Sequence, residues 1–168
     1  VICEDISNTV VITVTGKPAP PALASNSPIC EGDDLEITSE FVGGAFYNWS
    51  GPFGGSTDMN VFINEADLSN AGTYTLVIDV NGCQSDPATI NVTIKAKPQL
   101  PDITSNAPLC AGDTLLLSTS VVPGATYSWF GPAFSPFSTD RAPSVLNATA
   151  AIQGTYFLTV EKDGCISE

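Results

Sequence analysis

Histidine is absent from this chain of 168 residues, and basic residues and methionine are scarce. Lysine and arginine together number 5 against 18 aspartates and glutamates. Without histidine, neither a Ser-His nor a Cys-His nucleophile pair can form, and histidine metal centres are excluded. A net charge of −13 excludes a nucleic-acid partner, because binding phosphates requires clustered cations. We therefore expect a non-catalytic protein.

Long apolar runs are missing as well. No apolar stretch approaches the roughly 18–20 residues that a helix needs to cross a bilayer, and the shortage of cations removes attraction to anionic lipid. We therefore expect no direct insertion into a membrane. Charged residues make up only 14% of the chain, and small polar residues, glycine and proline take their place. This composition is typical of short strands joined by many turns.

An internal repeat dominates what is present. The segment at 25–39 (SNSPICEGDDLEITS) recurs at 105–119 as SNAPLCAGDTLLLST, and YNWSGP at 47–52 recurs at 127–132 as YSWFGP. Both recur after 80 residues, whereas the later Gly-Thr-Tyr and Gly-Cys motifs recur after 82. A fixed period of this length indicates an array of small modules.

The repeat sets the predicted domain boundaries. Residues 18–98 form a complete module, and residues 99–168 form a second module that lacks its last strand. Residues 1–17 match the last strand of a preceding or partner module. Proline-rich linkers at 17–21 and 95–101 favour extended geometry, so the modules are expected to form a rod.

Alternation of apolar and polar residues predicts strands throughout, and no segment keeps a helical period over three turns. Strands this short, with turn residues every 8–12 positions, indicate an antiparallel sandwich. The predicted strands are 10–15, 35–39, 45–49, 73–80 and 89–94.

Two markers make each predicted sandwich immunoglobulin-like. Trp49 and Trp129 stand in the third strand, where such folds place a core indole. Tyr74 and Tyr156 stand at the tyrosine corner, where a hydroxyl tethers a strand to the preceding turn. The predicted fold class is all-β, as tandem immunoglobulin-like antiparallel β-sandwiches that are stapled by disulfides and arranged as a rod.

The five cysteines follow the repeat. With no histidine and no Cys-x₂-Cys spacing, disulfides are favoured over zinc, and they imply a secreted or cell-surface location. We prefer pairing within each repeat, Cys30 with Cys83 and Cys110 with Cys165, which leaves Cys3 to a partner outside the chain. The rival scheme joins Cys3 to Cys30 and Cys83 to Cys110 across the linkers.

Two further groups of residues are candidate sites. Asp33 and Asp34 offer hard oxygen ligands for calcium, although a solvated turn is the simpler interpretation because the second copy keeps a single acid there. No other cofactor is predicted. Phe53, Phe134 and Phe137 lie in loops rich in glycine and proline, where they either contact a ligand or pack beneath their own loops.

The recurring motifs resemble those of tandem Ig-like repeats in giant surface proteins of Bacteroidota. The matches are a Cys-x-Gly opening, a Tyr-x-Trp-x-Gly-Pro strand, an Ala-Gly-Thr-Tyr segment and a closing Asn-Gly-Cys-x-Ser, at 30–32, 47–52, 71–80 and 81–85. Such proteins are typically exported by type IX secretion. They serve as cell-surface adhesins, including gliding-motility adhesins, or as stalks between other domains. The resemblance implies a structural or adhesive repeat.

Three functions fit the sequence. We prefer a non-catalytic structural or adhesive segment of a large extracellular filament or stalk protein, whose partners are neighbouring repeats. The second is a module that binds surface glycans or proteins through its loop aromatics. The third is a pilus-like subunit, in which residues 1–17 of one chain complete the open sandwich of the next by donating a strand.

Overall fold

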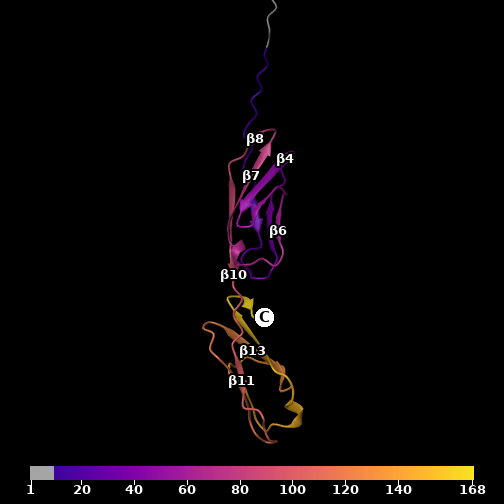
Figure 1. The fold of residues 1–168 in the computed structure, drawn as a ribbon. Coiled ribbons are helices and arrows are strands. Elements are labelled where there is room, and N and C mark those ends of the chain that lie inside the picture. The colour runs from indigo at the N-terminus through magenta and orange to yellow at the C-terminus, as the bar shows by residue number, and fades with distance from the viewer. Residues whose placement is uncertain (1–9) are drawn as a thin grey trace, which may run out of the picture.

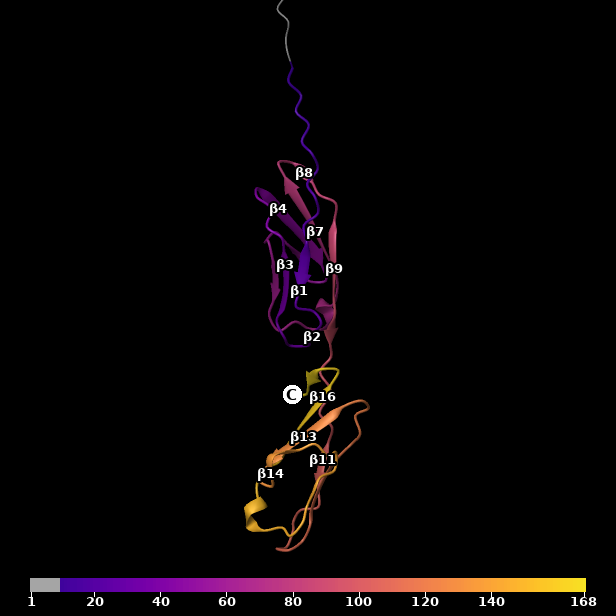
Figure 2. The same cartoon turned by 180° about the vertical axis from the view of Figure 1, so that it is seen from behind.

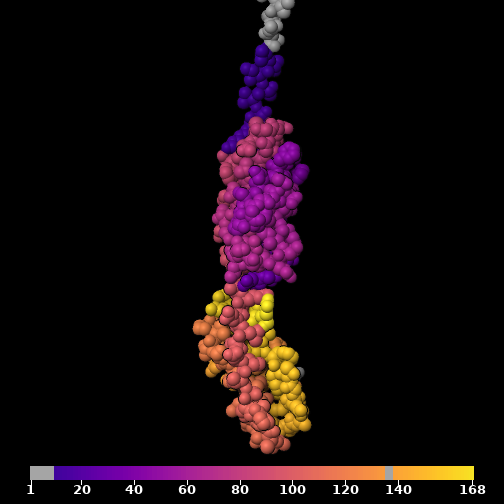
Figure 3. Space-filling model, in the orientation of Figure 1, coloured from indigo at the N-terminus to yellow at the C-terminus, as the bar shows by residue number. Residues whose placement is uncertain are grey.

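The computed structural model describes residues 10–168, with the backbone alone for residues 135–137. In this range the strands form two groups that share no sheet: the first repeat, β1 to β10, and the second repeat, β11 to β17. The two groups lie end to end (Figure 1, Figure 2), and the space-filling view shows an elongated rod (Figure 3). The C-terminal residues lie at the junction, near β10 (Figure 1). The predicted rod of tandem sandwiches is confirmed.

The first repeat is a sandwich of two antiparallel sheets. One sheet has the order β1-β3-β6, and the other has the order β5-β4-β7-β8, with β9 also paired to β7. A short parallel pairing of β2 with β10 lies beside them. The strands are β1 Leu23–Ser25, β2 Ile29–Cys30, β3 Leu35–Ser39, β4 Ala45–Gly51, β5 Gly54–Ser56, β6 Val61–Ile63, β7 Gly72–Val80, β8 Cys83–Gln84, β9 Ala88–Val92 and β10 Ile94–Lys95.

The second repeat keeps this order with fewer strands. A sheet of order β11-β12-β15 accompanies one of order β14-β13-β16-β17. Within the described residues, it has no counterpart of β2, β9 or β10. The strands are β11 Ile103–Ser105, β12 Leu115–Thr119, β13 Thr126–Gly131, β14 Phe134–Ser138, β15 Ser144–Val145, β16 Phe157–Lys162 and β17 Cys165–Ile166.

Each repeat has its own hydrophobic core between its two sheets. Along β7 every second side chain from Tyr74 to Ile78 is fully buried, as the alternating sequence requires. Trp49 and Trp129 are also buried, at 1% and 0% exposure. Trp49 Nε1 donates to the carbonyl of Asp58 at 3.1 Å, whereas Trp129 Nε1 has no partner among the described residues.

Both tyrosine corners are formed. Tyr74 Oη donates to the carbonyl of Asn70 at 2.8 Å, and Tyr156 Oη donates to that of Ile152 at 2.7 Å. Together with the buried indole and the strand order, this corner makes both repeats immunoglobulin-like.

Each corner tyrosine follows a short 3₁₀ turn, η1 (Leu68–Asn70) or η2 (Ala150–Ile152). Asp67 caps the first turn and Thr149 caps the second. Hydrogen bonds from the hydroxyl and then the amide of Ser69 lower the pKa of Asp67. A charged cap in one repeat is thus replaced by a neutral cap in the other.

The strand predicted at 10–15 is wrong. Residues 10–22 belong to no strand in the structure, and Val10, Val11, Ile12 and Val14 are 82–89% exposed. This N-terminal segment, residues 10–17, extends along the long axis away from the first repeat (Figure 1). Its β-branched sequence favours a strand, but no described strand lies beside it to accept its backbone hydrogen bonds.

Candidate functional site at the inter-repeat joint

Tight hairpins place two of the cysteines at the tips of their sandwiches. Val80 pairs with Cys83 across Asn81-Gly82, and Lys162 pairs with Cys165 across Asp163-Gly164. The four turn residues have φ between 53° and 85°. Positive φ at both central positions is typical of a type I′ turn, which Asn-Gly and Asp-Gly favour. The sequence thereby fixes each cysteine directly after its turn.

A second pair of cysteines lies on turns at the opposite ends of the sandwiches. Asp33 Oδ2 accepts a hydrogen bond from Cys30 N at 3.0 Å, and Asp113 Oδ2 accepts one from Cys110 N at 2.8 Å. Each aspartate amide in turn donates to the cysteine carbonyl, at 3.0 and 3.1 Å. In the first repeat β2, which ends at Cys30, and β8 lie at opposite ends (Figure 2).

The structure corrects the predicted cysteine pairing. Cys30 bonds to Cys165, with Cα atoms 5.7 Å apart and a sequence separation of 135. Pairing within a repeat is wrong because its two cysteines lie at opposite ends of the sandwich, and the rival scheme across the linkers is wrong as well. Cys83 and Cys110 are unbonded among the described residues. Cys3 lies outside them.

Two polar contacts accompany this disulfide. Lys95 Nζ donates to the carbonyl of Asp163 at 2.7 Å, and Lys97 Nζ lies 3.1 Å from Glu168 Oε1. We call the Cys30–Cys165 bond and these two contacts the inter-repeat joint. Because a surface ion pair contributes little by itself, the covalent bond is the main restraint.

The ion pair of the joint and a carbonyl–sulfur contact beside it recur at the other end of the first repeat. Lys17 forms an ion pair with Asp86, and the carbonyl of Thr15 lies 4.0 Å from Cys83 Sγ. The N-terminal segment therefore contacts the first repeat in the same way as β10 and the linker after it contact the second repeat. The corresponding contacts in the joint are Lys97 with Glu168 and the carbonyl of Lys95 at 4.0 Å from Cys165 Sγ.

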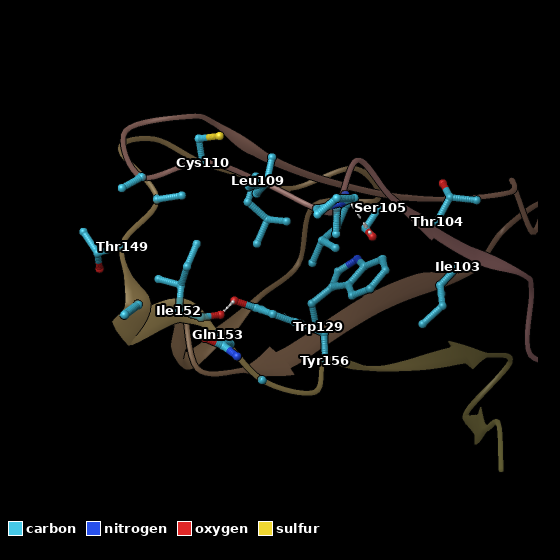
Figure 4. Close-up of a pocket in the computed structure, with 18 residues that line it drawn as sticks. Ile103, Thr104, Ser105, Leu109, Cys110, Trp129, Thr149, Ile152, Gln153 and Tyr156 are labelled. Carbon is cyan, nitrogen blue, oxygen red and sulfur yellow. Dashed lines mark hydrogen bonds between the residues drawn. The ribbon is translucent and has the colours of Figure 1, made fainter.

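The second repeat contains an open groove of about 640 Å³ beside Trp129 (Figure 4). Leu109 and Cys110 line one side of it and Tyr156 lies on the facing side (Figure 4), and Gly154 is also among the lining residues. Ile152 also lines it, and the lining is mainly apolar. Sequence reasoning predicted a missing last strand but not this cavity, whose shape depends on how far the two walls stand apart.

The calcium candidates brace turns in the structure. Asp33 accepts from the amide of Cys30, as above, and Asp34 Oδ1 accepts from that of Glu65 at 2.9 Å. No group of three or more acidic or cysteine side chains suited to a metal ion occurs among the described residues. A calcium site at this turn stays a prediction.

Two of the loop phenylalanines pack inward. Phe53 stacks on Tyr74 with ring centroids 5.4 Å apart, and Phe134 meets Tyr156 edge-on at 5.7 Å. Both are partly buried against their cores, which is the packing alternative stated above. The side chain of Phe137 lies outside the described part of the structure, and contact of these loops with a ligand stays a prediction.

Comparisons with known proteins support no family assignment. No protein-family profile matches the chain, and no curated protein matches it. Among solved structures it is similar to one chain in the crystal structure of a complex between the mouse coronavirus receptor-binding domain and its murine receptor (12% identity, 88% of this chain and 94% of that chain, TM-score 0.47). Murine CEACAM1b gives 12% identity, 88% and 96% coverage and a TM-score of 0.43. The human OSCAR ligand-binding domain gives 11%, 91% and 96%, and 0.40.

These TM-scores add nothing to the strand order and core that define the fold. A search of the described residues for a helix long and apolar enough to span a bilayer found none.

Proposed function

We propose that this chain is a non-catalytic structural segment of an extended extracellular array of immunoglobulin-like repeats. The observation that carries this proposal is the inter-repeat joint together with its recurrence at Lys17, Asp86 and Cys83. A contact set that occurs at successive ends of the repeats is the mark of a repeating connection. Each repeat then has the same relation to the one before it, and the array grows along one axis.

The joint is built to limit bending. Two covalent connections cross it, namely the linker that follows β10 and the Cys30–Cys165 bond. A single linker leaves two domains free to swing, whereas a second tether removes most of those orientations. Disulfides persist in oxidising compartments, which supports a location outside the cell. The net charge of −13 adds solubility and repulsion between neighbouring rods.

The finer assignment follows from the motifs. We infer a stalk or filament segment of a large adhesive surface protein, of the kind that Bacteroidota export by type IX secretion. The support for this assignment is the resemblance of the repeated cysteine, tryptophan and tyrosine motifs. Neighbouring repeats of the same polypeptide are the proposed partners, and surface glycans or proteins are the proposed targets of the array as a whole.

Small-angle X-ray scattering of the full chain tests the rod. The oxidised chain is expected to give a single elongated particle. In the double variant Cys30→Ser/Cys165→Ser the joint loses its second tether, so the two repeats can bend relative to each other. The maximum dimension of the particle is then expected to fall and the distribution of interatomic distances to broaden, while the far-UV circular dichroism stays unchanged. Cys83→Ser removes an unbonded cysteine and serves as the matched control. Identical scattering from the double variant and the oxidised chain would contradict the proposal.

A further inference from the structure

In each repeat a serine stands two positions after the hairpin cysteine and bonds back to the neighbouring strand. Ser85 N donates to the carbonyl of Ile78 at 2.8 Å, and Ser85 Oγ accepts from Ile78 N at 3.1 Å. Ser167 makes the same two bonds with Val160, at 2.8 and 3.0 Å. We call each pair of bonds a serine clamp. Because the clamp recurs with the same atoms, the Cys-x-Ser motif encodes a fixed local structure.

The clamp ends the hairpin in a defined register. In the first repeat, the β7–β8 ladder starts at the turn with the pair of Val80 and Cys83. A regular antiparallel ladder would later join Ile78 and Ser85 by two backbone bonds. One of these bonds is formed, but in the other the hydroxyl of Ser85 replaces its carbonyl as the acceptor. The cysteine is therefore fixed from both sides, by the turn before it and by the clamp after it.

Both clamps lie inside their sandwiches. Ser85 and Ser167 are 5% and 7% exposed, and Ile78 and Val160 are fully buried. A buried amide that loses its acceptor cannot turn to water, so it retains the cost of having left water. Removing the hydroxyl by a change of serine to alanine therefore weakens the hold on the hairpin while it hardly alters the volume of the core.

The clamp forms without a disulfide beside it. Cys83 is unbonded within the described part of the chain, yet the Ser85 clamp has the same atoms and nearly the same distances as the Ser167 clamp. In the second repeat the hairpin cysteine, Cys165, is bonded to Cys30 across the joint. The first hairpin is thus a reference for the second, with the same local structure and no bond.

We propose that Ser167 is a positioning residue for the inter-repeat joint, which holds the hairpin so that the thiol of Cys165 faces Cys30 before the bond forms. This inference rests on the proposed array and specifies what makes its joint close. A hairpin that is fixed in advance loses little conformational freedom on bonding, so the two thiols have a high effective concentration. Without the clamp, bond formation must also order the hairpin, and the joint becomes easier to reduce.

Equilibrium with glutathione measures this positioning. Two glutathione thiols reduce the joint disulfide to two cysteine thiols and leave as one glutathione disulfide. Alkylation followed by mass spectrometry gives the oxidised fraction, and hence the equilibrium constant for closing the bond. The full chain is used, with serine in place of the three cysteines outside the joint, Cys3→Ser, Cys83→Ser and Cys110→Ser.

Two matched alanine variants separate positioning from stability. Ser167→Ala is expected to lower the equilibrium constant for closing the bond about fivefold, the effect of one hydrogen bond. Ser85→Ala removes the same hydroxyl beside β8, at the end of the first repeat away from the joint (Figure 1), and is expected to leave the constant unchanged. The midpoint of urea unfolding is expected to fall in both variants. An unchanged constant in Ser167→Ala, or an equal fall in Ser85→Ala, overturns the proposal.

Hydrogen exchange of the Val160 amide, followed by NMR, tests whether the clamp holds without the bond. In the chain with an intact clamp, this amide is expected to exchange as slowly after reduction of the joint as before it. In the reduced Ser167→Ala chain it is expected to exchange roughly tenfold faster. If reduction alone accelerates exchange as much as the substitution does, the bond holds the clamp and the proposal is wrong. Either failure leaves the scattering test of the array unaffected, so the two proposals fail separately.

Discussion

Glycine at the end of the tryptophan strand sets how closely the tyrosine corner packs. A Cβ atom on Gly131 would lie 2.4 Å from Cδ1 of Tyr156, and on Gly51 it would lie 3.0 Å from Cδ1 of Tyr74. The Gly-Pro and Gly-Thr-Tyr motifs therefore recur together because they touch. Because the two motifs are well separated in sequence, only the folded structure shows this contact.

Replacing this glycine is expected to destabilise the second repeat. Gly131→Ala combines a positive φ of 156° with a clash against Tyr156. Gly124 has φ of 77° and no atom within 4 Å of an added Cβ, so Gly124→Ala shows a positive-φ backbone cost of about 1–2 kcal/mol without a clash. The clash is expected to add about 1–3 kcal/mol, measured by urea unfolding. Equal losses in the two variants would show that the contact with Tyr156 is unimportant.

The charged cap of the first repeat predicts a pH dependence. The hydrogen bonds from Ser69 hold the pKa of Asp67 below its ordinary value of 3.8 in the folded chain. Its contribution to stability is therefore full above pH 3.8 and is lost as the pH falls through the lowered folded pKa. Asp67→Asn keeps an acceptor without the charge.

We expect the wild-type chain to unfold at a higher urea concentration than Asp67→Asn at pH 7, and this difference to close as the pH is lowered towards 2. Urea titrations at several pH values measure it. A difference that stays constant over this range would mean that the charge of Asp67 is not involved.

At the scale of the strands, the open edge of the second repeat predicts a difference in dynamics. Residues 72–74 are held on one side by β9, whereas residues 154–156 lie beside the groove and outside any strand. In the Cys83→Ser/Cys110→Ser chain at low concentration, amides of 154–156 are expected to exchange hydrogen roughly a hundredfold faster than those of 72–74. Mass spectrometry of the two peptides measures this. Equal protection would show that the groove edge is already ordered without a strand.

Strand positions could be predicted where local sequence decides them. Alternation located the strands beginning near Leu35, Ala45 and Gly72, because one face of each is buried in its own sandwich. The same alternation over 10–15 predicted a strand that is not there. A strand requires a neighbour, and the pattern of one segment carries no information on whether that neighbour is present.

At the scale of the molecule, the repeat and the proline-rich linkers were sufficient to predict a rod. They were insufficient to predict its covalent connection, because cysteine spacing says nothing about the orientation of successive sandwiches. Only the end-to-end packing shows that the turn at Cys30 meets the hairpin tip at Cys165. The candidate site is therefore a property of two repeats together.

The same bond determines how the chain responds to a stretching force. Residues 31–164 lie inside the covalent loop that Cys30 and Cys165 close, so tension applied to the two ends passes through the sulfur atoms and bypasses that loop. Of the strands, only β1, β2 and β17 stand in the load path. Only the outer residues can be drawn out, to about 120 Å at roughly 3.5 Å per residue, against about 590 Å for the reduced chain. Single-molecule force spectroscopy with and without reductant measures the two lengths. Equal lengths would contradict this load path; unequal lengths would mean that oxidation sets how far each repeat can yield.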